Sequence, residues 1–183
     1  MRVFPITPES VSCPTTTNPN IRISGIIEDS IVDGPGFRTV VFTQGCPRRC
    51  RGCHNPQTQD FDKGEIRSVE SILSIVTNNS LTDGITLSGG EPFCQTDACA
   101  ALAKGAHEAG LSVWCYTGYT FEELVSGKEN WMRLLENIDV LVDGPFIIDE
   151  KTTNLCFRGS ANQRIVDVVA SLNKGETVLS SYN

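Results

Sequence analysis

Short hydrophobic runs, some of them alternating with polar residues, recur along the chain between polar loops rich in glycine and proline. Strands tolerate both patterns, whereas glycine and proline mark the turns between them. The pattern therefore predicts five strands, over residues 21–26, 39–42, 84–87, 111–116 and 138–142. The segment 164–172 fits a helix and a strand equally well.

Capping signals predict helices between the later strands. Ser68 precedes the periodic apolar positions of one helix, and Thr96 is predicted to cap another that stops before Gly110. Thr120 and Glu123 have the spacing of a capping box, which predicts a third helix. Because strands that alternate with helices pair in parallel through helical crossovers, the predicted fold class is α/β.

Each polar or glycine-rich segment of unusual composition directly follows a predicted strand. These segments are the loop over residues 44–63, Ser88–Pro92, Tyr116–Gly118 and Asp143–Gly144. The carboxyl ends of parallel strands lie at one edge of a sheet or barrel, where functional sites gather. A structureless loop as long as 44–63 is uncommon unless it is functional. We therefore expect one shared site built from these four segments.

The composition is that of a soluble globular protein of one domain, with 183 residues, 39% hydrophobic and 20% charged. The net charge of −7 argues against nucleic acid as a partner and against a polybasic membrane contact, so a protein or small-molecule substrate is expected. The sequence has neither an apolar run long enough to cross a bilayer nor a signal-peptide pattern, which favours a cytoplasmic location. Prolines among Ser and Thr in residues 1–20 predict an irregular extension before a single domain over 21–183.

Three of the eight cysteines are clustered in the loop after the second predicted strand, as Cys46-x3-Cys50-x2-Cys53. In a reducing cytosol, clustered cysteines more often hold metal, whereas scattered cysteines are small core residues. A [4Fe–4S] cluster has four irons, so three protein thiolates leave one iron open to the amino group and carboxylate of a bound molecule. This spacing is typical of radical S-adenosylmethionine (SAM) enzymes.

A zinc site is the alternative, because three thiolates and His54 could supply four ligands. His54 is adjacent to Cys53, however, which makes simultaneous tetrahedral ligation awkward, and the sequence has no second C-x2-C pair. Arg48, Arg49 and Arg51 could offset the charge of a cluster, dock an acidic electron donor, or be ordinary solvated residues. The remaining cysteines are expected to be core or incidental residues: Cys13, Cys94, Cys99, Cys115 and Cys156.

Several longer motifs either surround the cysteines or follow the later strands. Two lie early in the chain: Asp33-Gly34-Pro35-Gly36-Phe37-Arg38 and Phe42-x2-Gly45-Cys46-x3-Cys50-x2-Cys53-His54-Asn55. Three follow later: Tyr116-Thr117-Gly118-Tyr119-Thr120, Val142-Asp143-Gly144-Pro145-Phe146 and Phe157-Arg158-Gly159-Ser160-x-Asn162-Gln163-Arg164. With Gly52 in the penultimate position of the cysteine cluster, the chain resembles the radical SAM activases of glycyl-radical enzymes over about residues 21–168. Within them it is most similar to the subgroup that activates anaerobic ribonucleoside-triphosphate reductases.

The resemblance implies a partial (β/α) TIM-like barrel of the radical SAM type, with SAM bound across its open carboxyl-end face. It implies that Cys46, Cys50 and Cys53 hold a [4Fe–4S] cluster with one open iron. It further implies that Gly52 and His54 flank the adenine of SAM.

The same resemblance assigns roles to the later loops. Ser88-Gly89-Gly90-Glu91 would receive the methionine amino group, because glycines let the backbone approach a ligand and the carboxylate accepts from an ammonium. Thr117 and Asp143 would contact SAM or an ion near its carboxylate, although Asp143 also belongs to a good turn sequence. Arg158 and Arg164 would bind the SAM carboxylate or the partner protein, or be ordinary surface residues.

The activity implied by the resemblance is the activation of an anaerobic ribonucleoside-triphosphate reductase. A reduced cluster would pass one electron to SAM, and the 5′-deoxyadenosyl radical would take a Cα hydrogen from a glycine of the reductase. A flavodoxin-like protein is the expected electron donor. The rival functions are a radical SAM enzyme acting on another glycyl-radical enzyme or on a small molecule, and a zinc-stabilised binding module. A tail of about 110 residues after Glu70 leaves room for only a few βα units, which weighs against the other activases.

Overall fold

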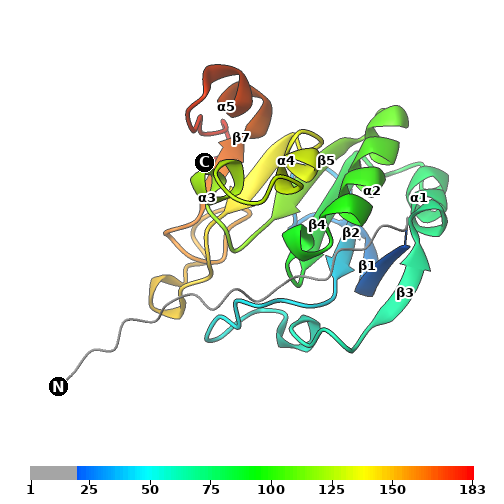
Figure 1. Cartoon of the computed structure of the whole chain (residues 1–183), viewed down its shortest axis with the longest axis horizontal. Coiled ribbons are helices and arrows are strands. Elements are labelled where there is room, and N and C mark those ends of the chain that lie inside the picture. The colour runs from blue at the N-terminus through cyan, green and yellow to red at the C-terminus, as the bar shows by residue number, and fades with distance from the viewer. Residues whose placement is uncertain (1–19) are drawn as a thin grey trace.

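A computed structural model describes residues 20–183, which fold around one seven-stranded sheet with the order β3-β1-β2-β4-β5-β6-β7 (Figure 1). The strands are β1 (Asn20–Ser30), β2 (Arg38–Thr43), β3 (Glu65–Ser68), β4 (Gly84–Gly89), β5 (Ser112–Tyr116), β6 (Val140–Asp143) and β7 (Arg164–Asp167). The helices are α1 (Val69–Asn78), α2 (Thr96–Glu108), α3 (Phe121–Val125), α4 (Trp131–Leu135) and α5 (Val168–Lys174). Residues 1–19, which contain nearly all of the predicted irregular extension, lie outside the described residues.

The four central strands β2, β4, β5 and β6 run parallel, as the alternation of strands and helices predicted. The outer strands differ: β1 pairs antiparallel with both β2 and β3, and β7 pairs antiparallel with β6. The connection over residues 31–37 carries no helix, and a connection this short joins antiparallel neighbours. The chain over residues 20–183 therefore has a mixed α/β fold with an open sheet, whose edge strands are β3 and β7.

Side chains of the central strands alternate between two faces of the sheet. Ile85 and Leu87 of β4 lie on the face that the helices cover, where they join Ile72 and Leu102 in the main hydrophobic core. Figure 1 shows α1, α2 and α4 on this face. The opposite, inner face carries Trp114 together with a smaller apolar cluster. None of the helices in residues 20–183 is both long and apolar enough to cross a bilayer.

Two of the three predicted helix caps were confirmed. The Ser68 side chain caps α1, and Thr120 forms the predicted capping box at the start of α3. The prediction for Thr96 was wrong, because Thr96 is the first residue of α2 and Gln95 occupies the cap position without a capping side-chain bond. The Thr96 hydroxyl instead donates to the carbonyl of Phe93 at 2.9 Å.

The undecided segment 164–172 contains both a strand and a helix. It begins as β7 and continues as α5, which Asp167 caps by accepting a hydrogen bond from the Ala170 amide at 2.9 Å. Two elements were not predicted from the sequence, namely β3 and α4. The first is a strand of four residues with one apolar side chain, and the second is a helix of five residues, so both carry too little periodicity to detect.

A buried arginine anchors the loop between β1 and β2. Arg38, which is 1% exposed, donates to Thr86 Oγ1 at 3.2 Å and to Ser112 Oγ at 2.6 Å. The Thr86 hydroxyl in turn donates to the Asp33 carbonyl at 2.8 Å. Burial lowers the pKa of Arg38 to about 10, so the guanidinium stays charged at neutral pH. The inner face thus holds the glycine-rich loop by these polar contacts, and Gly34 lies against the Trp114 ring.

Candidate cluster and cofactor site

The segments that follow β2, β4, β5 and β6 meet at one edge of the sheet, as expected, and line a cavity of about 130 Å³. We call this space the cluster cavity. Its lining includes nine of the predicted site residues: Cys46, Cys50, Cys53, His54, Ser88, Gly89, Gly90, Glu91 and Thr117. The predicted residues Gly52 and Asp143 do not line it. Four segments distant in sequence are therefore brought together around the three cysteines.

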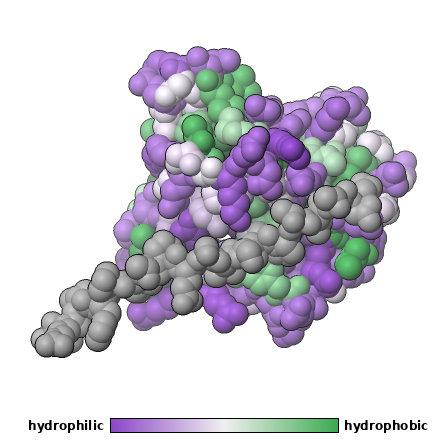
Figure 2. All heavy atoms as spheres, viewed as in Figure 1, coloured by the Kyte–Doolittle hydropathy of each residue, from purple (hydrophilic) through white to green (hydrophobic). Residues whose placement is uncertain are grey.

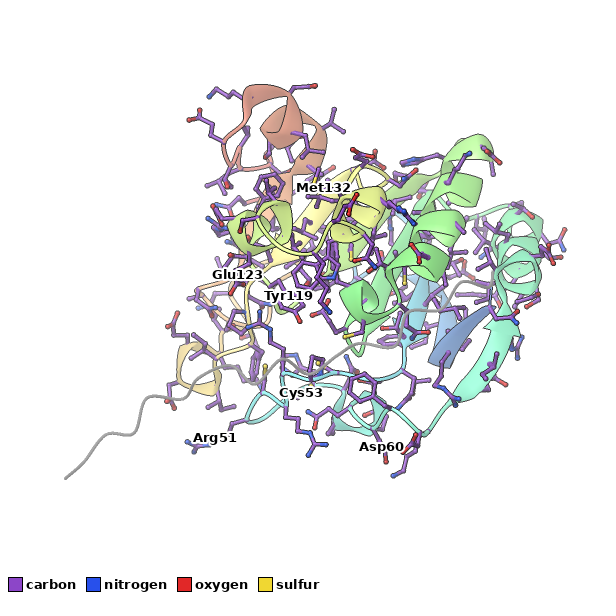
Figure 3. The ribbon with its side chains drawn as sticks, in the orientation of Figure 1. Arg51, Cys53, Asp60, Tyr119, Glu123 and Met132 are labelled. Carbon is purple, nitrogen blue, oxygen red and sulfur yellow. The ribbon has the colours of Figure 1, made fainter. Side chains whose placement is uncertain are left out.

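Backbone hydrogen bonds fix the loop that carries the cysteines. The Gly45 and Cys46 amides donate to the Thr58 and Gln59 carbonyls at 2.7 and 3.1 Å. In Figure 3, Cys53 lies on the side of the loop that faces Tyr119 and the strand ends, and Arg51 points away from the molecule.

Two residues between the cysteines adopt left-handed backbone conformations. They are Arg49 at φ 47° and Gly52 at φ 74°. The positive φ at Gly52 favours glycine, and a Cβ there would lie 2.7 Å from Ile148 Cδ1, so the Ile148 side chain would have to move to admit one. These turns let the flanking cysteines line one cavity.

The donor set of the cluster cavity fits an iron–sulfur cluster, because it offers three cysteine thiols from one loop. Among residues 20–183, no three His, Cys, Asp or Glu side chains are grouped so that they could hold one metal ion. A four-iron cluster instead binds each thiolate on a different iron and so needs its cysteines around one cavity. Burial, with Glu91 nearby, raises the pKa of Cys46 to about 11, so iron would have to displace the proton on binding.

Gly89, the last residue of β4, and Gly90 after it pack against the protein's own backbone. A Cβ at Gly89 would lie 2.7 Å from Phe42 Cα, and one at Gly90 would lie 2.5 Å from the Gly45 carbonyl oxygen. The Gly90 and Glu91 amides donate to the Thr43 and Gly45 carbonyls at 2.8 and 2.9 Å. Admission of a ligand by these glycines stays a prediction. In the structure Gly89 makes room for the backbone of β2 and Gly90 for the start of the cysteine loop.

Glu91 joins the loop after β4 to the loop after β5. Its carboxylate is 1% exposed and accepts hydrogen bonds from the Thr117 hydroxyl at 2.8 Å, the Gly118 amide at 2.9 Å and the Phe93 amide at 3.2 Å. Burial raises the pKa of Glu91, while these three donors oppose the rise. A carboxylate can accept about four hydrogen bonds, so one site remains for a further donor from the cavity.

Asp143 lies at the end of β6 but is directed toward other protein groups. It accepts a hydrogen bond from the Phe121 amide at 2.8 Å and forms a buried ion pair with Arg164. Arg164 also pairs with the exposed Glu122 at 2.7 Å. This network fixes the start of α3 and the antiparallel pairing of β7.

A second cavity, of about 700 Å³, adjoins the first. We call it the large cavity. The two share the residues His54, Asn55, Ser88, Tyr116, Phe146 and Gln163. The large cavity is further lined by residues 151–159, including Arg158. No role was predicted for Tyr116, Phe146 or Gln163, although all three belong to the motifs that carried the family resemblance.

Comparisons with known proteins agree with the donor set. A family model described as a 4Fe-4S single cluster domain matches residues 32–166. The chain is 36% identical over 141 residues to the anaerobic ribonucleoside-triphosphate reductase-activating protein of Salmonella typhimurium, covering 73% of this chain and 90% of that protein. Proteins of the same name match from Escherichia coli K12, at 36% identity over 73% of this chain and 90% of that protein, and from Enterobacteria phage T4, at 30% over 73% and 86%. The solved structure of QueE from Escherichia coli is similar with a TM-score of 0.48 and 20% identity, over 55% of this chain and 53% of that one.

Proposed function

Because the chain belongs to the 4Fe-4S single cluster family and to the anaerobic ribonucleoside-triphosphate reductase-activating proteins, we propose that it installs a glycyl radical on such a reductase. It is thus a radical SAM enzyme that activates a glycyl-radical enzyme. The observation that carries the proposal is the convergence of Cys46, Cys50 and Cys53 with the Ser88–Glu91 loop on one cavity. An activase needs this arrangement, since the iron that lacks a protein ligand must face the cofactor it binds.

The bound groups would supply the hard chemistry. A reduced cluster held by Cys46, Cys50 and Cys53 would supply one electron for cleavage of the S–C5′ bond of SAM, with methionine and 5′-deoxyadenosine as the products. The hydrogen atom gained by 5′-deoxyadenosine would come from the Cα of a glycine of the reductase, which would be left as a glycyl radical. The protein would bind and orient the cluster and SAM and exclude water from them, and the reaction requires no general acid or base.

Cys46, Cys50 and Cys53 are proposed to hold the cluster, with its open iron toward the loop after β4. Glu91 would use its remaining acceptor site for the ammonium of the methionine moiety, beside the backbone of Gly89 and Gly90. Thr117 would support it, because its hydroxyl already orients the Glu91 carboxylate.

The remaining predicted residues surround these. His54 lines both cavities and packs on Phe146 with ring centroids 4.6 Å apart, a position suited to flanking the adenine together with Gly52. Asp143 is proposed to lie near the SAM carboxylate, which it would contact directly or through an ion. It also fixes the start of α3 beside this site.

The wider setting follows the same proposal. Residues 21–183 would form one radical SAM domain whose open sheet corresponds to a partial TIM-like barrel, with the inner face toward SAM. Arg49 and Arg51 are exposed and make the cysteine loop locally basic, which suits docking of an acidic, flavodoxin-like electron donor. The net charge of −7 favours protein over nucleic acid as a partner, and a cytoplasmic site of action fits the reducing conditions that the cluster needs.

The proposal is tested by EPR on the anaerobically reconstituted protein mixed with SAM, a strong reductant and an anaerobic ribonucleoside-triphosphate reductase. A glycyl-radical signal that requires every component is the expected result. Cleavage of SAM to 5′-deoxyadenosine without that signal would contradict the partner and leave a radical SAM enzyme with another target. Zinc in place of iron and sulfide after anaerobic purification would contradict the cofactor.

A further inference from the structure

The residues after α5 return to the sheet and run along β7. The Asp167 amide donates to the Val178 carbonyl at 2.9 Å, and the Ser180 amide donates to the Ile165 carbonyl at 2.8 Å. Between them, Val166 and Leu179 form an antiparallel bridge. Figure 1 shows this end of the chain beside β7, and Figure 2 shows hydrophobic side chains gathered near α5 on an otherwise largely hydrophilic face. A turn follows, in which the Asn183 amide donates to the Ser180 carbonyl at 3.0 Å.

Tyr182 completes an aromatic cluster on the inner face of the sheet. Its ring centroid lies 5.5 Å from that of Trp114 and 6.2 Å from that of Phe157, and the latter two are 5.4 Å apart. All three pairs are edge-to-face, the geometry that the quadrupoles of aromatic rings favour. The segment after α5, residues 175–183, which we call the C-terminal tail, therefore packs directly on Phe157, a residue that lines the large cavity.

Asn183 holds Arg158, which follows Phe157 in the segment 151–159 that forms one wall of the large cavity. Its side-chain oxygen accepts hydrogen bonds from the Ile165 amide at 3.0 Å and from Arg158 Nη1 at 3.0 Å. Arg158 Nη1 also donates to the Gln163 carbonyl at 3.2 Å. The guanidinium is thus held between the tail and the start of β7.

The wall segment needs such support, because its backbone conformation is unfavourable. Phe157 has φ of 57°, a left-handed value that costs a bulky side chain free energy and persists only where the surroundings impose it. The Tyr116 hydroxyl donates to the Phe157 carbonyl at 3.0 Å from the side of the sheet. Tyr182 contacts the Phe157 ring and Asn183 binds Arg158, so both residues support the same segment.

We propose that Tyr182 and Asn183 are positioning residues that hold Phe157 and Arg158 in the wall of the large cavity, and that this wall receives the polypeptide of the reductase. The inference rests on the proposed function. None of residues 151–159 lines the cluster cavity, so the tail acts on the part of the site remote from the cysteines. The rim of the large cavity also includes Ile31 and Val32, which are 66% and 70% exposed and suit contact with a protein rather than with water.

The test compares Tyr182→Ala and Asn183→Ala with the matched variants Tyr182→Phe and Asn183→Asp in the full-length reconstituted protein. Phe keeps the ring, and Asp keeps the acceptor oxygen for Arg158. The assay measures the KM for the reductase in glycyl-radical formation, and separately the rate of 5′-deoxyadenosine release without reductase. Each alanine variant should raise the KM at least about fivefold, because Tyr182→Ala loses two aromatic contacts and Asn183→Ala loses a hydrogen bond from the charged Arg158. The rate without reductase should stay unchanged, and the Phe and Asp variants should match the wild type.

The two alanine variants overturn the inference if they keep the wild-type KM. A parallel fall in SAM cleavage without reductase also overturns it, because that result indicates a general structural role. Failure of the proposed function is recognised separately in the wild-type protein: SAM cleavage with no glycyl radical on the reductase would refute the partner and, with it, this inference. The Asn183 pair keeps the test decisive should Tyr182→Ala fail to fold.

Discussion

On the helix-covered face of the sheet, Leu87 and Leu102 are fully buried among apolar side chains, whereas at the edge where the strands end Glu91 and Thr117 are nearly as buried but polar. The first region is stabilised by apolar burial, which has no preferred direction. The second depends on directed hydrogen bonds, each of which needs its partner in place.

The two regions therefore have different roles: one stabilises the fold, and the other positions the residues of the site. Apolar packing tolerates exchange among side chains of similar volume, so the helix-covered face sets stability. A polar network loses its geometry when one member is removed, so the strand-end edge sets the positions of the loops. Substitutions in the two regions should therefore separate stability from activity.

The largest effect is expected at the cysteine loop. Cys50→Ala should abolish cluster assembly and SAM cleavage, because two thiolates cannot hold the cluster that three are proposed to hold. Iron and sulfide analysis after anaerobic reconstitution measures the first, and 5′-deoxyadenosine release the second. Cys99→Ala, a matched change at a cysteine buried in the helix-covered core, should keep the iron. Retained SAM cleavage in Cys50→Ala would refute the assignment of the cluster.

The next largest effect concerns stability alone. Leu102→Ala leaves a cavity in the core between α2 and its neighbours, and should lower the free energy of unfolding by about 2–5 kcal/mol. Denaturant unfolding of the purified protein measures this change. The control is Leu81→Ala, since Leu81 is 59% exposed and should lose less than about 0.5 kcal/mol. SAM cleavage by folded Leu102→Ala should match the wild type; a proportional loss would show that the two regions are not independent.

The comparison of the two regions also explains what could be predicted from the sequence. The strands of the apolar core were found because their hydrophobic runs are long enough to carry a period, as in residues 111–116. The meeting of four loops at one edge followed from the rule that parallel strands share their carboxyl ends, and the structure confirmed it. The family resemblance supplied the function, and the curated relatives confirm it.

What could not be predicted depends on contacts between distant segments. The sequence offered Asp143 as a cofactor residue, but nothing in its neighbours indicates that Arg164 returns to pair with it. The antiparallel β7 and the contacts of Tyr182 have the same origin, since both arise after a turn whose direction is set by tertiary packing. Local patterns carry no information on such pairings.

A smaller effect is expected at Glu91. Glu91→Gln keeps the shape of the side chain but turns its NH2 group toward one of the hydrogen-bond donors that now face the carboxylate. The buried group left unpaired should lower the free energy of unfolding by about 1–3 kcal/mol. The loss of the charge should also weaken SAM binding. Because burial raises the pKa of Glu91, the folded state binds this proton more tightly than the unfolded state does. Wild-type stability should therefore fall as the pH rises from about 4.5 through the raised pKa, and this contribution should vanish in Glu91→Gln.

Denaturant unfolding at a series of pH values, with SAM binding measured calorimetrically on the reconstituted protein, tests both parts. Thr117→Val is the matched variant, since it removes one donor to the carboxylate at nearly constant volume. It should raise the pKa of Glu91 further and extend to higher pH the range over which stability falls. Parallel pH profiles for wild type and Glu91→Gln would contradict the assignment of the titrating group.

The smallest effect is expected at Glu122, which shares Arg164 with Asp143 but lies at the surface. Hydrogen bonds from Arg164 and Thr177 lower the pKa of Glu122 to about 2, so its contribution to stability is present above pH 4.5 and is lost as the pH falls toward 2. The Glu122 side chain is 58% exposed, and solvent screening should limit the loss in Glu122→Gln to less than about 1 kcal/mol at neutral pH. Urea unfolding should show the difference from wild type shrinking between pH 5 and pH 2. A loss larger than that of Glu91→Gln would mean that the Arg164 network, rather than the Glu91 junction, holds the strand-end edge together.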